Sequence, residues 1–297
     1  GDMKVITYPR GCDKVHEKAG RRQKAGIPAE RRNTGKGDRR QNLSASKRPS
    51  AKVGIWEGLM GSIHKELKAR QRAERDSYPE NLSLRVHRAL SWLDRAEQDD
   101  DPDSRFIFLW IAFNAAYATE IDDRVHLNEQ ATFNGFLEKL CDLDGEKRIG
   151  ELVWKAYPNA IRVLLDNPYV FSCFWDHQKG HLTEAQWKQS FDGAKKAAHS
   201  ALAQQNTPVV LSIVFSRIYT LRNQIMHGGA TWSGSVNRDQ IRDCVAILAN
   251  LVPVIIEVMM DNPRALWGEA SYPVVKPNHE GKRAGWRRSS HETDRQY

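Results

Sequence analysis

The chain has 297 residues and a formal net charge of +8 at neutral pH. Its length alone would allow about two domains. The charge is uneven, because residues 1–52 contain 15 Lys/Arg and 5 Asp/Glu, a net of +10, whereas residues 53–297 have a net charge of −2. These figures exclude a uniformly basic protein and assign the basic charge to the first segment.

The first segment has few large apolar residues and many Arg, Lys, Gly and Ser, and the residues after Pro277 are similar. Such segments cannot bury enough apolar surface to offset their chain entropy. We therefore expect a mostly disordered basic leader at 1–77, one folded domain at 78–275 and a disordered tail at 276–297. The leader either binds nucleic acid or membrane non-specifically through its charge, or is a solvated tail or translated sequence upstream of a start such as Met60.

The sequence favours a cytoplasmic protein that does not enter a membrane. No apolar segment typical of a secretory signal is found near the beginning of the chain. The longest apolar run, 244–260, is interrupted by Asn250, Pro253 and Glu257, which predicts a buried helix and not a membrane span. Cysteine occurs without paired spacing, at positions 12, 141, 173 and 244. We expect these cysteines to be reduced thiols.

Helical spacing dominates the first half of the domain. Ser83 is a suitable N-cap for a helix whose apolar residues begin at Leu84. The acidic stretch 99–103, which includes Pro102, is typical of a helix start and predicts a helix to about Glu120. Two more helices are predicted, at 134–142 and at 146–165 with a break near Pro158.

Three further helices are predicted in the second half. The first opens with a capping box formed by Thr183 and Gln186. The second has Thr207 as N-cap, Pro208 as its first residue and Gly228 as terminator. The third begins at a capping box of Asn237 and Gln240, ends near Met260 and is expected to kink at Pro253. Since no alternating strand pattern and no repeat occur, we predict an all-α helical bundle.

The stretch "LRNQIMHGG", residues 221–229, carries the most distinctive chemistry. One residue of helix turns by about 100°, so Asn223 and His227 share a face, whereas Arg222 and His227 differ by about 140°. Gly228 and Gly229 could let the last turn unwind, so that His227 swings back. Asn223 could then bridge Arg222 and His227 by hydrogen bonds.

Two interpretations of this stretch follow from the residues alone. An arginine, an amide and an imidazole can together bind a phosphate and transfer a proton near neutral pH. The negative end of the helix dipole would favour the protonated imidazole. Alternatively, Arg222 and His227 cap the helix by bonding its free carbonyls, and the glycines are an ordinary stop signal. The spacing does not decide between a reaction centre and a capped helix end.

The stretch resembles the motif of the HEPN superfamily, an all-helical group rich in ribonucleases. That motif is an arginine, usually followed by Asn, Asp or His, and a histidine after four to six intervening residues. Arg222, Asn223 and His227 match its three elements. Residues 106–118 and 167–175 resemble uncharacterised, phage-defence-related members of the group. The resemblance covers roughly residues 80–262.

The resemblance implies a HEPN-like helical domain that forms a homodimer, in which two copies of the motif face each other across a cleft. It further implies a metal-independent endoribonuclease that cleaves RNA by attack of the 2′-OH, leaving a 2′,3′-cyclic phosphate. His227 would be general base or acid, Arg222 would bind the phosphate and Asn223 would orient the pair. No cofactor or metal is implied. The implied setting is a toxin or phage-defence system, which can include an antitoxin or regulatory partner.

A rival hypothesis of another class is a non-catalytic module that binds RNA, nucleotide or a partner protein through Arg222 and His227. The other candidate residues have less distinctive patterns. Cys173, His177 and His181 have the spacing of metal ligands on one helix, but no fourth ligand is evident and local packing is the favoured interpretation.

Arg217 either adds positive charge to the cleft or is an ordinary exposed arginine. The acids at 99–103 are interpreted as belonging to a helix start and not to a metal site. Trp232 and Trp267 could stack on bases, although tryptophans usually fill cores.

Overall fold

The computed structural model describes residues 60–117, 129–235 and 237–270, and the predictions for residues 1–59 and 271–297 lie outside this range. Within the described ranges the regular structure is helical, with no strand, which confirms the all-α prediction. The helices are α1 (Met60–Glu74), α2 (Glu80–Glu97), α3 (Pro102–Tyr117), α4 (Glu129–Leu143), α5 (Arg148–Glu151), α6 (Pro158–Asp166), α7 (Ser172–Gln178), α8 (Glu184–Ala203), α9 (Thr207–Met226) and α10 (Arg238–Asp261), with short helical turns η2 (Arg75–Ser77), η3 (Leu152–Ala156) and η4 (Pro168–Val170).

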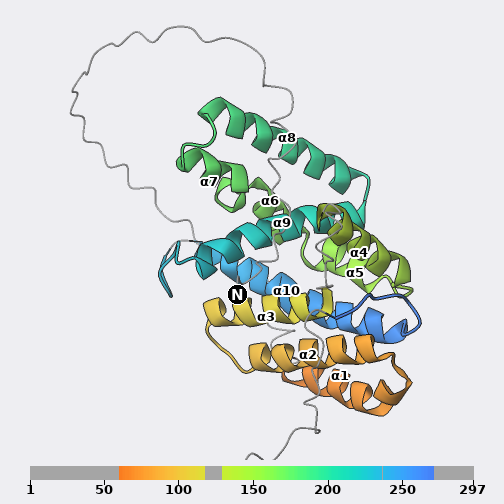
Figure 1. Ribbon diagram of the computed structural model, residues 1–297. Coiled ribbons are helices and arrows are strands. Elements are labelled where there is room, and N and C mark those ends of the chain that lie inside the picture. Colours follow the sequence, from red (N-terminus) through yellow and green to blue (C-terminus); the bar gives the residue numbers. More distant parts are fainter. Residues whose placement is uncertain (1–59, 118–128, 236, 271–297) are drawn as a thin grey trace, which may run out of the picture.

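The helices pack in layers around α3, α9 and α10 (Figure 1). Helix α3 lies between α2 and α10, and α1 packs on the outer side of α2. Helix α9 crosses this group and also contacts α4, α6 and α8. The α7–α8 pair lies beyond α9, so α9 joins the main bundle to a smaller helical unit.

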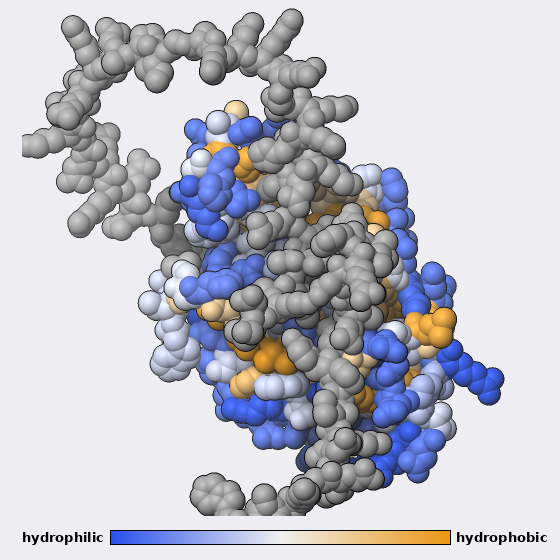
Figure 2. Space-filling model, in the orientation of Figure 1, coloured by the Kyte–Doolittle hydropathy of each residue, from blue (hydrophilic) through white to orange (hydrophobic). Residues whose placement is uncertain are grey.

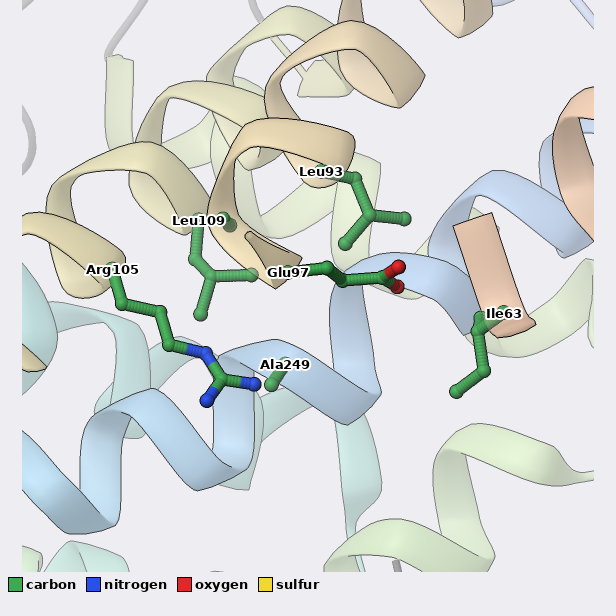
Figure 3. A pocket seen from close by; sticks show the side chains of 7 residues that line it. Ile63, Leu93, Glu97, Arg105, Leu109 and Ala249 are labelled. Carbon is green, nitrogen blue, oxygen red and sulfur yellow. The ribbon is translucent and has the colours of Figure 1, made fainter. Parts of the chain in front are cut away.

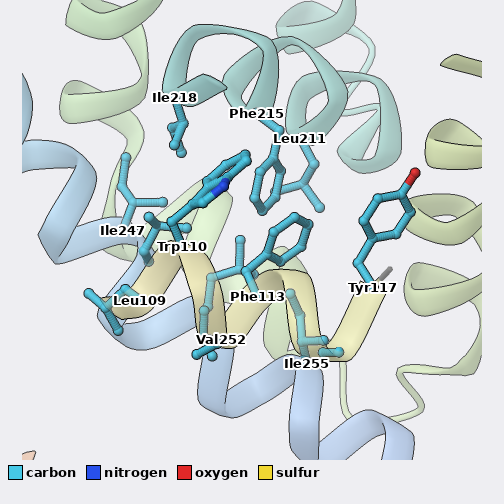
Figure 4. Close-up of a cluster of buried hydrophobic side chains, with 14 of the residues drawn as sticks. Leu109, Trp110, Phe113, Tyr117, Leu211, Phe215, Ile218, Ile247, Val252 and Ile255 are labelled. Carbon is cyan, nitrogen blue, oxygen red and sulfur yellow. The ribbon is translucent and has the colours of Figure 1, made fainter. Parts of the chain in front are cut away.

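The main core fixes α9 against α3 (Figure 4). The rings of Phe113 in α3 and Phe215 in α9 stack with centroids 4.3 Å apart, and both residues are buried. One turn further along, Trp110 meets Tyr219. Each fully buried side chain of this size stabilises the fold by roughly 1.5–3 kcal/mol. The end of α9 is therefore attached to a rigid core.

A smaller cluster attaches α7 and α8 to α9. Phe171 and Cys173 are buried there, with Trp187 and Phe191 packed against them. The guanidinium of Arg217 lies 4.4 Å from the centroid of the Phe171 ring. This cation–π contact comes from α9, so Arg217 helps to dock the α7–α8 unit.

Several predicted helix boundaries are confirmed. The capping box of Thr183 and Gln186 is present at the start of α8. Helix α6 begins at Pro158, as the predicted break requires. Helix α3 begins at Pro102 after Asp101, whose carboxylate accepts the N–H of Ser104 at 2.9 Å. The acids at 99–103 thus include an N-cap, as the sequence indicated.

Other helix starts were predicted wrongly. Helix α2 begins at Glu80, directly after Pro79, one turn before the predicted cap Ser83. Helix α9 is capped by Asn206, whose side chain accepts the N–H of Val209 at 3.2 Å, and not by Thr207. In each case a residue just upstream provides a suitable helix start.

The capping box predicted for α10 is also wrong. Asn237 has a φ of 59° and makes no side-chain cap. Its amide Nδ2 instead donates to Gln224 Oε1 at 2.7 Å. The Asn237 side chain, which the local pattern assigned to the cap, is therefore bonded to α9 instead.

Helix α1 belongs to the fold, although the sequence assigned its residues to the leader. Leu67 is buried, and Arg70 Nη1 lies 2.7 Å from Asp261 Oδ1 at the end of α10. The domain boundary predicted at residue 78 is therefore too late by this helix. The sequence of α1 has too few apolar residues to predict a buried helix. Part of its attachment to the fold comes from an ion pair to α10, which an apolar pattern does not reveal.

Helix α10 is the central buried helix of the bundle. It is long and apolar enough to cross a membrane by composition alone, but 72% of its most apolar window is buried inside the fold. Pro253 lies within the helix without ending it. This agrees with the prediction of a buried core helix.

The cysteines only partly match the expected reduced state. Cys141 and Cys244 are free thiols. Burial raises the pKa of the Cys141 thiol to about 12, so Cys141 is protonated at neutral pH. Cys173 is bonded in a disulfide, so the expectation of a reduced thiol is wrong for Cys173.

Candidate functional site at the end of helix α9

The end of α9 is capped by backbone groups. His227 is the C-cap residue, and Gly228 follows with a φ of 69°, which glycine adopts without strain. The N–H of Gly228 donates to the carbonyl of Ile225 at 3.2 Å, and the N–H of Gly229 donates to the carbonyl of Gln224 at 2.7 Å. This pair of bonds is a Schellman motif. The glycine amides therefore cap the helix.

Arg222 and Asn223 are joined side by side on the last turn. Nη1 of Arg222 donates to Oδ1 of Asn223 at 3.0 Å. The Nε of Arg222 is buried without an acceptor, and no described carboxylate forms an ion pair with Arg222. The guanidinium thus keeps its charge uncompensated within the described part of the chain and retains donors that an anion could accept.

His227 is exposed at the helix end. Among the residues that the structure describes, its imidazole makes no hydrogen bond. Its backbone N–H donates to the carbonyl of Asn223 at 3.0 Å. The predicted bridge is therefore only half present, since the Asn223 side chain bonds Arg222 but not the imidazole. Because α9 stays helical to Met226, His227 does not swing back towards Arg222.

The loop after α9 is fastened to α3. Both carboxylate oxygens of Asp103 accept from Nη2 of Arg238, at 2.6 and 2.8 Å. Asp103 Oδ2 also accepts the backbone N–H of Ser233 at 2.9 Å. Asp103 is 7% exposed, whereas the Arg238 side chain is 28% exposed, so the acidic half of this ion pair is the part shielded from water. Asp101 of the acidic stretch caps α3, whereas Asp103 holds the loop beside the motif.

Gln224 holds the other side of the motif. Its Nε2 donates to the carbonyl of Tyr169 in η4 at 2.7 Å, and its Oε1 accepts from Asn237 at the start of α10. Gln224 lies between Asn223 and the capping residues. The last turn of α9 is therefore connected through Gln224 to two separate segments of the fold, which limits its movement.

Trp232 and Trp267 have different environments. Trp267 is 7% exposed and its Nε1 donates to the carbonyl of Asn262, so it belongs to the core. Trp232 is 76% exposed, and its Nε1 donates to Asp101 Oδ2 at 3.1 Å. Burial alone would raise the pKa of the Asp101 carboxyl, but hydrogen bonds from Ser104 and Trp232 outweigh it and the pKa lies below its ordinary value.

The remaining sequence candidates lie away from the motif. Cys173 is buried, while His177 stacks on Trp187 and its Nδ1 lies 2.9 Å from the carbonyl of Leu182. These contacts agree with local packing. Within the described ranges, no group of three or more His, Cys, Asp or Glu residues is placed to hold a metal ion.

Arg217 is neither exposed nor part of the motif. It is 2% exposed, and burial lowers its pKa to about 10. Both alternatives considered from the sequence are therefore replaced by a structural one, the contact with Phe171. The spacing in the sequence could have indicated this structural role. Arg217 and Gln224 are seven residues apart, so they share one face of α9, and that face meets η4 and α7.

The sequence also gave no indication of a narrow pocket between α1, α2, α3 and α10 (Figure 3). Figure 3 shows the Glu97 carboxylate pointing towards Ile63 of α1, and Arg105 extending towards Ala249 of α10. Glu97 accepts the backbone N–H of His64 at 3.2 Å. Burial raises the pKa of the Glu97 carboxyl to about 7. The pocket is lined by helices other than α9 and is separate from the motif.

The coloured part of the face shown in Figure 2 is mostly hydrophilic, with smaller hydrophobic areas. Comparison of the chain with family models, curated proteins and solved structures found no match. The function must therefore be inferred from the chemistry at the end of α9.

Proposed function

We propose that the protein is a metal-independent endoribonuclease of the HEPN type, with Arg222, Asn223 and His227 as its catalytic residues. One observation carries the proposal: the glycine amides cap α9, so neither Arg222 nor His227 is needed to satisfy the helix carbonyls. The alternative of a helix end capped by these side chains thereby loses its physical basis. The match of the three residues to the HEPN motif supplies the reaction class.

The proposed reaction needs no metal because RNA carries its own nucleophile. The 2′-OH loses a proton to a general base, and its oxygen forms a bond to the adjacent phosphorus. The bond from phosphorus to the 5′ oxygen breaks, and that oxygen takes a proton from a general acid. The products are a 2′,3′-cyclic phosphate and a 5′-OH.

Each residue has a distinct role in this reaction. The exposed imidazole of His227 transfers the protons. The guanidinium of Arg222, which has no carboxylate partner among the described residues, binds the phosphate and stabilises charge on its oxygens. Asn223 accepts one guanidinium N–H at 3.0 Å and so orients Arg222. The anchors through Asp103 and Gln224 keep this turn in place.

We further propose that the active form is a homodimer. Two proton transfers require a base and an acid, and the motif has a single histidine. Two chains that meet at the ends of their α9 helices would supply two imidazoles and two guanidiniums across one cleft. The resemblance also suggests a toxin or phage-defence role with an antitoxin or regulatory partner, and the lack of an apolar signal segment near the beginning of the sequence favours a cytoplasmic location.

A second candidate function is non-catalytic binding of RNA, nucleotide or a partner protein. One observation favours it: within the chain, no hydrogen bond joins the side chains of Arg222 and His227. The two hypotheses differ in what happens to RNA. A dimer in which both residues converge from two chains would support catalysis, whereas a monomer at micromolar concentration in sedimentation experiments would favour the binding module.

The experiment that tests the proposal is incubation of the purified protein with total RNA, followed by chemical analysis of the new ends. Cyclic phosphate and 5′-OH ends are expected. Intact RNA after prolonged incubation, or ends with a 3′-OH and 5′-phosphate, would contradict the proposed reaction.

A further inference from the structure

Trp232 occupies the corner of a tight turn next to the motif. The N–H of Gly234 donates to the carbonyl of Thr231 at 3.0 Å, and Ser233 has a φ of 52°. A Cβ on Gly234 would lie 2.5 Å from Thr231 Oγ1, so the turn closes this tightly only with glycine there. The geometry projects Trp232 outward, and the residue is 76% exposed.

The exposed indole is held in position by hydrogen bonds. Its Nε1 donates to Asp101 Oδ2 at 3.1 Å, and the next residue, Ser233, donates its N–H to Asp103 at 2.9 Å. Both acceptors lie at the start of α3, which belongs to the core. A large aromatic side chain is thus presented to solvent in a fixed orientation. Because the indole is already ordered, less side-chain entropy is lost when a ligand binds.

The residues next to Trp232 in the sequence favour a planar ligand over a protein surface. Residues 228–231 and 233–235 are Gly, Ala, Thr and Ser, with no second large apolar side chain. Protein interfaces require a contiguous apolar core. A lone aromatic face suits stacking of a single nucleobase, which needs one ring and no surrounding patch.

We propose that Trp232 is a stacking platform for a base of single-stranded RNA bound at the end of α9. This inference rests on the proposed ribonuclease function and adds a residue that positions the substrate. Trp232 follows His227 by five residues, a distance of at most about 17 Å along the chain. One short RNA segment can therefore contact both.

Asp101 is a positioning residue in this proposal. Its low pKa keeps the carboxylate charged at neutral pH, which disfavours a phosphate beside the indole. The base, which is uncharged, is not repelled in this way. The RNA backbone is accordingly directed towards Arg222 while the base lies on Trp232.

The test separates stacking from cleavage by using His227→Ala as the background. Binding of a fluorescein-labelled single-stranded RNA is measured by fluorescence anisotropy, with and without Trp232→Ala. The Kd should rise about 5- to 100-fold, in keeping with loss of one base–aromatic stack. Trp232→Phe keeps a ring but loses the bond to Asp101, and Asp101→Ala keeps the indole but loses the same bond, so each should have an intermediate effect.

Trp92→Ala is the matched control. Trp92 is also exposed, at 37%, but lies on α2 and stacks on Phe108. It should leave the RNA affinity unchanged. An RNA duplex should bind without dependence on Trp232, because its bases are already stacked.

The outcomes distinguish this inference from the proposed function. Equal Kd values for the Trp232→Ala and parent proteins, or no RNA binding at all, would overturn the platform. If the substitution changes only self-association in sedimentation, Trp232 is part of an interface and the platform is again overturned. If binding depends on Trp232 but the protein with His227 intact cuts no RNA, the platform stands and the ribonuclease proposal fails.

Discussion

The backbone N–H of Gly229 donates a hydrogen bond of 2.7 Å to the carbonyl of Gln224 across the end of α9. This bond turns the chain away from the helix axis immediately after His227. The carbonyls of Asn223, Gln224 and Ile225 all accept backbone N–H groups and so need no side chain, and His227 remains exposed. The imidazole at this position is therefore not needed to cap the helix and is available for other chemistry.

Gly228→Ala should destabilise the protein, because a φ of 69° strains any residue with a Cβ. The expected loss in the free energy of unfolding is about 1–2 kcal/mol, measured by urea denaturation. Gly193→Ala is the control, because Gly193 lies within α8 with open space around its Cβ position. That change should stabilise by roughly 0.5–1 kcal/mol. Equal effects of both substitutions would contradict the cap geometry.

Asp103→Ala should release the loop that carries Trp232. Asp103 is 7% exposed and its partner Arg238 is half-buried, so the loss should lie between about 1 kcal/mol, as for an exposed pair, and about 3 kcal/mol, as for a fully buried pair. The midpoint of urea unfolding should fall accordingly. Asp239→Ala removes an exposed pair with Arg242, which is worth about 1 kcal/mol or less. A similar loss for both would mean that the Asp103 anchor is unimportant.

Glu97→Gln should stabilise the protein at high pH. Burial raises the pKa of Glu97 from 4.5 to about 7, and Asp94 adds to the shift, whereas the His64 backbone N–H and the charges of Arg105 and Lys65 oppose it. The folded protein therefore binds this proton more tightly than the unfolded chain, so the contribution of Glu97 to stability falls as pH rises from about 4.5 through 7. The stability advantage of the variant should be small at pH 5 and larger at pH 8. Parallel stability curves would refute this assignment.

Asn223→Ala should lower the rate of RNA cleavage less than loss of His227, because Asn223 orients Arg222 and transfers no proton. Arg222→Lys should recover little of the activity, since a lysine lacks the planar, two-pronged grip on phosphate. Both effects are measured as kcat/KM on one RNA substrate. Full activity of the lysine variant would show that charge alone suffices.

The sequence predicted the helical class because the apolar spacing and the start signals are local. Three predictions based on local signals agree with the structure: the capping box of Thr183 and Gln186, the helix start at Pro158 and the helix end at Gly228. The wrong starts of α2 and α9 have a local cause, a suitable residue just upstream, whereas the error at α10 comes from a contact between helices. Asn237 was predicted from its neighbours, yet its side chain bonds Gln224 in another helix.

The assignment of Arg222, Asn223 and His227 to a site stays a prediction, and the structure bears on their geometry alone. The pattern identified Arg222, Asn223 and His227, and the structure confirms the bond between the first two. It could not identify the anchors, because Asp103 lies 135 residues before its partner Arg238. Arg217 was misjudged for a similar reason, since Phe171, on which it stacks, comes from η4–α7.

The most direct test of the central claim is the cleavage of single-stranded RNA in EDTA by the wild-type, His227→Ala and Arg222→Ala proteins, each verified as folded by circular dichroism. The wild type should cut RNA in EDTA and leave 2′,3′-cyclic phosphate and 5′-OH ends, because the 2′-OH is the nucleophile and Arg222 supplies the positive charge. Both variants should be inactive, and a 2′-deoxy nucleotide at the cut position should block the wild type. Cleavage that EDTA abolishes, or full activity without the imidazole of His227, would contradict the account.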